Sequence, residues 1–430
     1  MFRYPRINSG LLFHLLDDEG RDETMDAVGV YVHIPFCRAK CAYCDFNSYA
    51  GLEHLFAPYV RALAREIELA GGWHLRARTI YLGGGTPTVL PLDLLGQVLA
   101  ACRRAFSVSK GAEVTVEANP GTVDGDYLAG LLSLGVNRLS LGVQSFDEGE
   151  LRLLERIHTA QEAVEACHLA REAGFDNLNL DLIYGIPRQT LAGWRETLHR
   201  ALDLHPDHLS LYALTLEEHT PLARRVARGE VPAPDDDLAA EMYVLAEETL
   251  AKAGYVHYEI SNWARPGRQC RHNLTYWRNQ PYLGFGAGAH SYFRGVRWWN
   301  VSSPEEYIAR LMQGPEPAVM EAGVQRPSPA GGLGVSPNNF SSPAVAGAER
   351  IDRALEMAET MILGLRLVEE GVSFREFEGR FGRKLEEVYG RELRELEGLG
   401  LIEISKGRVR LTPRGRLLGN EVFQRFLPES

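Results

Sequence analysis

The feature that most constrains the fold of this chain is a repeated alternation between short β-branched or aliphatic runs and longer segments of helical period. The strand-like runs are VGVYVHI (28–34), TIYLGG (79–84), EVTVEA (113–118), NRLSLGV (137–143), NLNLDLIYG (177–185) and HLSLYALT (208–215). The helix candidates between them span 55–70, 93–106, 160–173, 190–203 and 238–253. This repetition predicts an α/β fold with a parallel sheet built from right-handed crossovers. Six such units are too few for a closed eight-stranded barrel, so we expect an open partial barrel or a doubly wound sheet.

Composition divides the chain into four regions. Residues 1–27 mix charge with short apolar patches, and we interpret them as a poorly ordered lead-in. Residues 28–312 contain the repeated units and form the predicted core domain. Residues 313–347 hold six Pro and six Gly, a density that interrupts both helices and strands, so we predict a linker or a disordered insertion. Residues 348–430 are expected to form a smaller C-terminal domain.

The C-terminal domain has the pattern of a winged-helix-like unit. Helices are predicted near 349–368, 373–379 and 383–398, and LIEISKGRVRL then reads as a hairpin with Gly407 at its turn. Its basic residues are Lys406, Arg408, Arg410, Arg414 and Arg416. Because these charges alternate with apolar residues, we interpret them as the solvated face of a strand.

Charge and hydropathy exclude two classes of partner. The 430 residues carry a formal net charge of −11, which argues against a nucleic-acid surface, because binding phosphates requires a local excess of Lys and Arg. No apolar run approaches the length of a membrane span, and the N-terminus lacks the layout of a signal peptide. We therefore expect a cytoplasmic protein whose thiols stay reduced.

Three of the six cysteines, Cys37, Cys41 and Cys44, lie within the stretch YVHIPFCRAKCAYCDFNSY (31–49), just past the first predicted strand. Active sites of parallel α/β folds form at the carboxyl ends of strands. Three thiolates on a four-iron cluster would leave one iron open for an outside ligand. The spacing alone also allows unligated thiols, or a zinc site completed by His33 or a distant residue.

Polar residues recur where later predicted strands end. A glycine-rich turn, GGGTPT (83–88), follows the second strand, and Glu117 ends the third. Gln144 ends the fourth, Arg156 follows twelve residues later, and Asp181 lies in the fifth. Each alone is usually a buried, hydrogen-bonded polar residue. An acid, an amide, a guanidinium and an acid at successive strand ends indicate one shared site.

The cysteine stretch resembles the signature of the radical S-adenosylmethionine (SAM) superfamily. The resemblance extends from about Tyr31 through Tyr292 and is specific to the branch that contains oxygen-independent coproporphyrinogen III oxidases and the haem chaperones of the HemW family. It implies a radical SAM partial (β/α)6 barrel with a C-terminal domain of the type found in that branch. It also implies a [4Fe-4S] cluster on Cys37, Cys41 and Cys44 whose open iron binds the amino and carboxylate groups of SAM.

The resemblance implies a set of cofactor contacts. Carboxylates accept hydrogen bonds from a ribose or an amine, and an Arg pairs with the methionine carboxylate. The weakest match is Thr215, because the family contact there comes from the backbone. The other implied contacts are Tyr31, Tyr43, Gly84, Gly85, Thr86, Glu117, Gln144, Arg156 and Asp181.

Two departures separate the relatives within that branch. The oxidase pattern carries an additional cysteine two residues after the third, where this chain has Phe46, and a longer segment before the cluster. Conversely, CRHNLTYW (270–277) resembles the HNxxYW motif of the haem chaperones. The motif implies haem contacts at His272, Asn273, Tyr276 and Trp277, and histidine is a common axial ligand of haem iron. A lone histidine is more often simply packed, and His290 in its glycine-rich setting is a further candidate.

These observations lead to three hypotheses. The first is a haem chaperone of HemW type that binds a [4Fe-4S] cluster, SAM and haem and transfers haem to an unidentified acceptor haemoprotein, including one reached by peripheral docking at a membrane. The second is an oxygen-independent coproporphyrinogen III oxidase that works through a 5′-deoxyadenosyl radical. The third is a zinc or redox-thiol protein. Phe46 and the HNxxYW motif favour the first hypothesis. The sequence does not decide whether the protein cleaves SAM in an enzymatic reaction.

Overall fold

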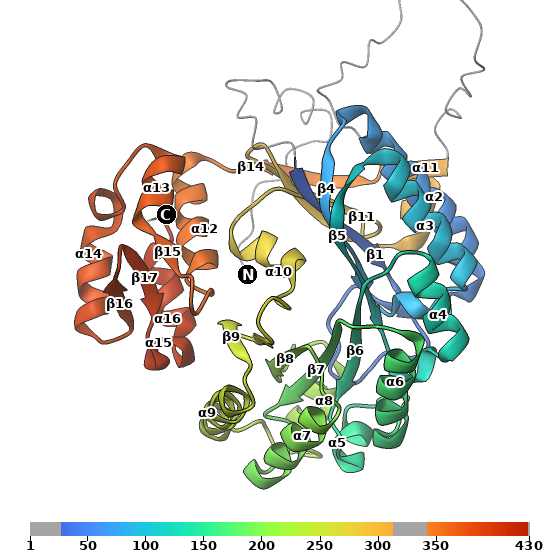
Figure 1. Ribbon diagram of the computed structural model, residues 1–430, viewed down its shortest axis with the longest axis horizontal. Coiled ribbons are helices and arrows are strands. Elements are labelled where there is room, and N and C mark those ends of the chain that lie inside the picture. The colour runs from blue at the N-terminus through green and yellow to red at the C-terminus, as the bar shows by residue number, and fades with distance from the viewer. Residues whose placement is uncertain (1–26, 313–341, 429–430) are drawn as a thin grey trace, which may run out of the picture.

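The computed structural model describes residues 27–312 and 342–428. The predicted lead-in, apart from Ala27, and most of the predicted linker lie outside these described residues. The chain forms a large α/β unit with a curved sheet and a smaller C-terminal unit beside its open edge (Figure 1).

Six parallel strands form the centre of a 12-stranded sheet. They are β1 (Ala27–Ile34), β4 (Arg76–Gly84), β5 (Ser107–Ala118), β6 (Arg138–Gln144), β7 (Leu178–Tyr184) and β8 (His208–Ala213). All five neighbouring pairs from β1 to β8 are parallel. Each strand overlaps one of the strand-like runs of the sequence. The prediction of an α/β partial barrel is therefore confirmed.

Further strands extend both edges of this core, and the sequence patterns did not indicate them. Beyond β1 lie β11 (Tyr282–Phe285), β12 (His290–Phe293), β13 (Val296–Asn300) and β14 (Val345–Arg350). Beyond β8 lie β10 (Asn262–Ala264) and β9 (Val256–Glu259). Apart from β11, which runs parallel to β1, these strands pair antiparallel. The strands β9 and β10, and the strands β11 to β13, are joined by short turns that leave no helical period in the sequence.

The strand β14 stands where the sequence predicted the end of a linker and the start of a helix. Small residues allow this pairing, because a Cβ atom at Gly347 would lie 2.5 Å from the Trp299 ring on β13. The helix instead begins at Arg353, where the Asp352 carboxylate accepts a hydrogen bond from the Leu355 N–H at 2.8 Å. Residues 345–350 thus belong to the large sheet.

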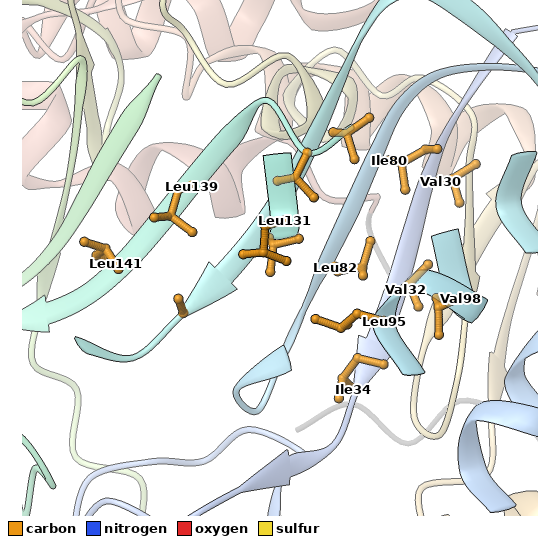
Figure 2. Close-up of a cluster of buried hydrophobic side chains, with 14 of the residues drawn as sticks. Val30, Val32, Ile34, Ile80, Leu82, Leu95, Val98, Leu131, Leu139 and Leu141 are labelled. Atoms are coloured by element: carbon orange, nitrogen blue, oxygen red, sulfur yellow. The ribbon is translucent and has the colours of Figure 1, made fainter. Parts of the chain in front are cut away.

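Helices cover the outer, convex face of the sheet (Figure 1). They are α2 (Phe56–Ala70), α3 (Leu92–Ala105), α4 (Gly125–Ser133), α5 (Glu148–Leu153), α6 (Ala160–Ala173), α7 (Leu191–Asp203) and α9 (Asp236–Lys252), and α11 (Pro304–Met312) packs beside α2. The short helix α8 (Pro221–Ala227) instead packs against Ala42 through Leu222. Alternate strand residues such as Val30, Val32 and Leu139 face the covering helices and form the main core (Figure 2). Each such buried aliphatic side chain contributes about 1.5 to 3 kcal/mol of transfer free energy.

The inner face of the same strands is polar. In β6, Leu139 and Leu141 belong to the apolar core, while Arg138, Ser140 and Gln144 line a cavity inside the barrel. The two sets alternate because successive strand residues point to opposite faces. The barrel therefore encloses a polar chamber.

The C-terminal unit has its own core and a three-stranded sheet. Its elements are α12 (Arg353–Gly364), β15 (Val372–Ser373), α13 (Phe374–Phe381), α14 (Leu385–Gly398), β16 (Ile402–Ser405), β17 (Arg408–Leu411), α15 (Pro413–Leu417) and α16 (Gly419–Phe423). The predicted hairpin is β16–β17. The basic residues of this wing are not a solvated face throughout: Arg410 donates to the Glu369 carbonyl at 2.5 Å, and Arg416 pairs with Glu247 of α9 at 2.8 Å.

Candidate functional site

A cavity of about 450 Å³ opens at the carboxyl ends of the parallel strands. Every residue that the sequence predicted for the cluster or the cofactor lines it, with the exception of Tyr31. The Tyr31 hydroxyl instead lies 3.0 Å from His33 Nδ1, and its ring stacks beside Tyr81 at 6.2 Å between centroids. The strand ends bring these residues together because parallel strands finish at one edge of a sheet.

The three cysteines lie on one anchored loop at the mouth of this cavity. Cys37 ends the short strand β2 (Phe36–Cys37), which pairs with β3 (Tyr49–Ala50). Backbone hydrogen bonds fix the turn that follows: Ala42 N–H donates to the Leu154 carbonyl at 3.1 Å, and Leu222 N–H donates to the Ala42 carbonyl at 2.8 Å. The Thr86 hydroxyl donates to Cys37 Sγ at 3.6 Å. All three thiols are partly exposed toward the cavity.

The arrangement of the thiols bears on which metal group they fit. Among the described residues, no group of three or more His, Cys, Asp or Glu side chains is placed to hold a single metal ion. One zinc ion would need its sulfur ligands roughly 4 Å apart. Both ring nitrogens of His33 are already within hydrogen-bond distance of Tyr31 and of the Asn47 carbonyl, the latter at 2.8 Å. Three thiols that line one cavity are a donor set that fits three irons of a [4Fe-4S] cluster.

Arg156 reaches the cysteine loop from the segment after α5. Its Nη1 lies 3.1 Å from Cys41 Sγ, and its Nη2 donates to the Gly142 carbonyl at 2.6 Å. Next to it, Gln144 ends β6 with a φ of 68°, a left-handed conformation that is uncommon outside glycine and turns the chain at the cavity wall. The guanidinium therefore stands at the cluster position, where it can pair with an anion.

Glu117 is held by the turn that follows β4. Tyr81 O–H donates to one carboxylate oxygen at 2.7 Å, and Gly84 N–H donates to the other at 3.0 Å. Burial, with a smaller contribution from Asp181, raises the pKa of Glu117 to about 7. A Cβ atom at Gly83 would lie 2.9 Å from this carboxyl group, so the glycines of the turn let the acid approach the backbone.

Asp181 belongs to a hydrogen-bonded layer below the cavity mouth. Its two carboxylate oxygens accept from Ser140 O–H at 3.1 Å and from the Asn179 side-chain amide at 2.8 Å. Burial raises the pKa of Asp181 as well. Thr215 lines the wall just past the end of β8 at Ala213. Two acids of raised pKa and the guanidinium groups of Arg138 and Arg156 thus face one chamber, an arrangement typical of ligand sites.

The predicted haem motif forms the helix α10 (Arg271–Trp277), which lies between the barrel and the C-terminal unit (Figure 1). His272 is 1% exposed. Its Nδ1 lies 2.8 Å from Thr79 Oγ1, and its Nε2 lies 2.8 Å from the Tyr276 hydroxyl. Burial and the charge of Arg138 lower the pKa of His272 to about 3. The imidazole is neutral and both of its nitrogens have partners.

The other residues of the motif face different spaces. Asn273 lines the barrel cavity. Trp277 lines a second cleft, of about 460 Å³, between α10 and the C-terminal unit, where Arg366 stacks on its ring at 4.3 Å. The structure therefore does not bring the four motif residues to one cavity, and their binding of haem stays a prediction. His290 lies apart from them and stacks on Trp299.

Several residues of the chamber were missed by reasoning from sequence. They share one feature, a place in a strand beside at least one buried Leu, so that polar and apolar residues alternate. These residues are Arg138, Ser140, Ser210 and Tyr212, and Asn179 shows the same alternation in β7. Strict polar–apolar alternation in a parallel strand was the available signal, because strands covered on both faces read as continuous apolar runs.

Comparison with known proteins tests the family. The model of the radical SAM superfamily matches residues 31–201, and that of the HemN C-terminal domain matches residues 351–418. A curated relative from Bacillus subtilis, named Heme chaperone HemW, is 36% identical over 402 residues, which are 93% of this chain and 99% of that protein. The chain belongs to the HemW family of radical SAM proteins. The predicted superfamily and branch are thereby confirmed.

Other HemW relatives and one solved structure agree. A Mycobacterium tuberculosis relative, also named Heme chaperone HemW, is 37% identical over 93% of this chain and 94% of that protein. The structure of Escherichia coli coproporphyrinogen III oxidase (HemN), a radical SAM enzyme, superposes with a TM-score of 0.76 and 24% identity over 93% of this chain and 90% of that chain. At this identity the likeness supports the fold alone. Membership of the HemW family implies a [4Fe-4S] cluster and SAM.

Among the described residues, no helix is long and apolar enough to cross a membrane.

Proposed function

We propose that this protein is a haem chaperone of the cytoplasm, which binds a [4Fe-4S] cluster, SAM and haem and transfers haem to an acceptor haemoprotein. The observation that carries this proposal is the near-full-length similarity to the Bacillus subtilis and Mycobacterium tuberculosis proteins named Heme chaperone HemW. Phe46 supports it, because the oxidase pattern has an additional cysteine at that position.

The residues at the cavity mouth fit the cluster and SAM. Cys37, Cys41 and Cys44 would hold the cluster, which when bound supplies an open iron and one electron. Arg156 lies against Cys41 and would pair with the methionine carboxylate. Glu117 and Asp181 would accept hydrogen bonds from the ribose or the amine. The backbone of Gly84, Gly85 and Thr86 would line the cofactor.

Haem binding through α10 requires a local rearrangement. His272 can ligate iron only after its Nε2 leaves the Tyr276 hydroxyl or its Nδ1 leaves Thr79. Trp277 already borders the cleft beside the C-terminal unit, so an aromatic surface is available there for a macrocycle. We propose that haem enters from this cleft and that α10 shifts to present His272.

A second candidate function is the oxygen-independent oxidation of coproporphyrinogen III. The completeness of the cavity favours it, since the acids, the guanidinium and the three thiols expected for SAM all face one space. Phe46 opposes it. This side chain is 70% exposed at the cavity mouth, and it cannot replace the thiol that the oxidase pattern carries there.

One anaerobic experiment separates the two functions. Reconstituted protein is incubated with SAM, a reductant and coproporphyrinogen III, and protoporphyrinogen IX is measured. The same preparation is titrated with haem and then mixed with an apo-haemoprotein. Stoichiometric haem uptake and transfer without decarboxylated product would support the chaperone. Formation of protoporphyrinogen IX would identify an oxidase.

A further inference from the structure

Arg138 is a buried guanidinium with an unsatisfied donor. The residue is 2% exposed and stands at the first position of β6, the end of the strand opposite the cysteines. Its buried Nε–H donates to no acceptor within residues 27–312 and 342–428, and no ion pair of its guanidinium is found within those ranges. An unpaired charge of this kind is costly to bury, yet it lines the barrel cavity.

The acid nearest to Arg138 is already engaged. One oxygen of the Glu113 carboxylate accepts from His272 N–H at 3.0 Å, and the other accepts from Arg271 N–H at 3.1 Å. The Cys270 thiol also points at it, at 3.6 Å. Glu113 thus caps the start of α10, and it acts on the charge of Arg138 together with Cys270 without a hydrogen bond to the guanidinium. The Nε–H donor of Arg138 stays without an acceptor among the described residues.

The floor of the cavity differs from its mouth. Six residues separate Arg138 from Gln144 along β6, which is about 20 Å for an extended strand. Near the floor, Asn273 also lines the cavity, while Ser140, Asn179 and Ser210 bond to one another. None of these belongs to the set that the family resemblance implies for the cluster or SAM, although Ser140 and Asn179 also donate to Asp181 of that set. The floor therefore offers polar groups beyond those assigned to SAM.

We propose that the Arg138 guanidinium binds the carboxylate of a second ligand that occupies the floor of the barrel beneath SAM. A guanidinium offers a planar fork of donors that matches a carboxylate. Glu117 and Asp181 line the same cavity, so a singly charged anion is better tolerated than a dianionic phosphate. Two sources share this chemistry, a porphyrin propionate and a free short-chain carboxylic acid.

The first test needs no variant. Reconstituted protein with SAM is titrated with haem, with the dimethyl ester of haem and with sodium propionate. If a porphyrin propionate is the ligand, haem binds roughly tenfold or more tightly than its ester, since a buried charged hydrogen bond is lost. If a free acid is the ligand, propionate binds and haem and its ester do not differ. Equal binding of haem and ester together with no binding of propionate would overturn the proposal.

Variants then assign the effect to Arg138. Arg138→Met should abolish the preference for the carboxylate, and Arg138→Lys should retain part of it, because Lys keeps the charge but not the fork. Thr115→Val is the matched control, since Thr115 is buried and pairs in register with Arg138 on the neighbouring strand. If Arg138→Met leaves the preference intact, or weakens SAM binding by the same factor, the guanidinium does not form a second subsite.

The haem comparison rests on the proposed function, whereas the propionate comparison does not. Haem binding that is unaffected by esterification and by Arg138→Met, together with no binding of propionate, would leave the chaperone proposal standing and reject this one. If the protein takes up no haem but binds propionate in a way that depends on Arg138, the chaperone proposal is rejected and this one stands.

Discussion

The mouth of the barrel and the helix α10 both carry residues that a family motif marks for ligand binding. The residues at the mouth share one cavity, whereas those on α10 do not. At the mouth, the side chains of Cys37, Arg156 and Glu117 converge on one cavity, the first and last from strand ends and Arg156 from the segment after α5. On α10, His272 is paired on both sides and only Asn273 and Trp277 border open space, each a different one.

The difference follows from geometry. Parallel strands end at a common edge, so polar residues placed there meet whatever their distance in the sequence. A helix distributes successive residues around its axis at 100° steps. Four motif residues within two turns therefore point toward different parts of the protein. The mouth is organised before any ligand binds, whereas α10 must move to offer its histidine.

The largest expected effect concerns the mouth. Cys41→Ala should abolish the brown absorbance and the iron content of the reconstituted protein, because two thiols do not hold the cluster. Cys102→Ala is the matched control, since Cys102 is fully buried in α3. Loss of iron in the control as well would show that folding, and not ligation, limits reconstitution.

The second effect tests whether α10 opens. His272→Ala should weaken the Soret band of added haem and lower the free energy of unfolding by about 2 to 4 kcal/mol, because Thr79 and Tyr276 lose their partner. Tyr276→Phe removes one of the same hydrogen bonds but no iron ligand, so it should destabilise the protein and leave the Soret band in place. An unchanged spectrum in His272→Ala would exclude this histidine as a ligand.

A third effect concerns pH at the mouth. The pKa of Glu117, at about 7, lies above that of the unfolded chain, so the folded protein binds the extra proton between roughly pH 4.5 and 7, and the stability due to this group is lost as pH rises through 7. Ionisation leaves an acceptor for SAM, so SAM affinity should rise between pH 6 and 8, by up to roughly tenfold.

Glu117→Gln isolates the contribution of Glu117 to this pH dependence, because any titration of SAM itself is the same for the variant and the unaltered protein. The variant should bind SAM more weakly at pH 8 and should show a shallower rise from pH 6 to 8. Parallel pH profiles for the two proteins, measured by equilibrium dialysis, would mean that Glu117 does not titrate in this range.

The smallest effect tests the contact between α10 and the C-terminal unit. Arg278, which follows the helix, pairs with Glu370 at 2.7 Å, and both are partly exposed. Glu370→Gln should cost less than about 1 kcal/mol of unfolding free energy but should speed haem uptake in stopped-flow mixing, because α10 is released more easily. Glu395→Gln, which disrupts the exposed pair with Arg391 on α14, serves as control. Equal uptake rates in both variants would place the haem entry elsewhere.

Much of the barrel was predictable because its signals are local. Six strand-like runs, the helical segments between them and three closely spaced cysteines lie within short windows of the chain, and each run became a parallel strand. The edge strands were not predictable from these local signals. The strand β14, for example, depends on Gly347 packing under Trp299, and these two residues are far apart in the sequence.

The sequence by itself determined the alternation of apolar and polar residues along the strands, the loop with Cys37, Cys41 and Cys44, and the family, since local periodicity and motif spacing carry that information. Only the tertiary structure decided that His272 is paired with Thr79 and Tyr276 and that the Nε–H of Arg138 has no acceptor in the part of the chain that the structure describes. Whether a polar group is satisfied depends on residues from other elements that folding brings within hydrogen-bond distance, and no local pattern records them.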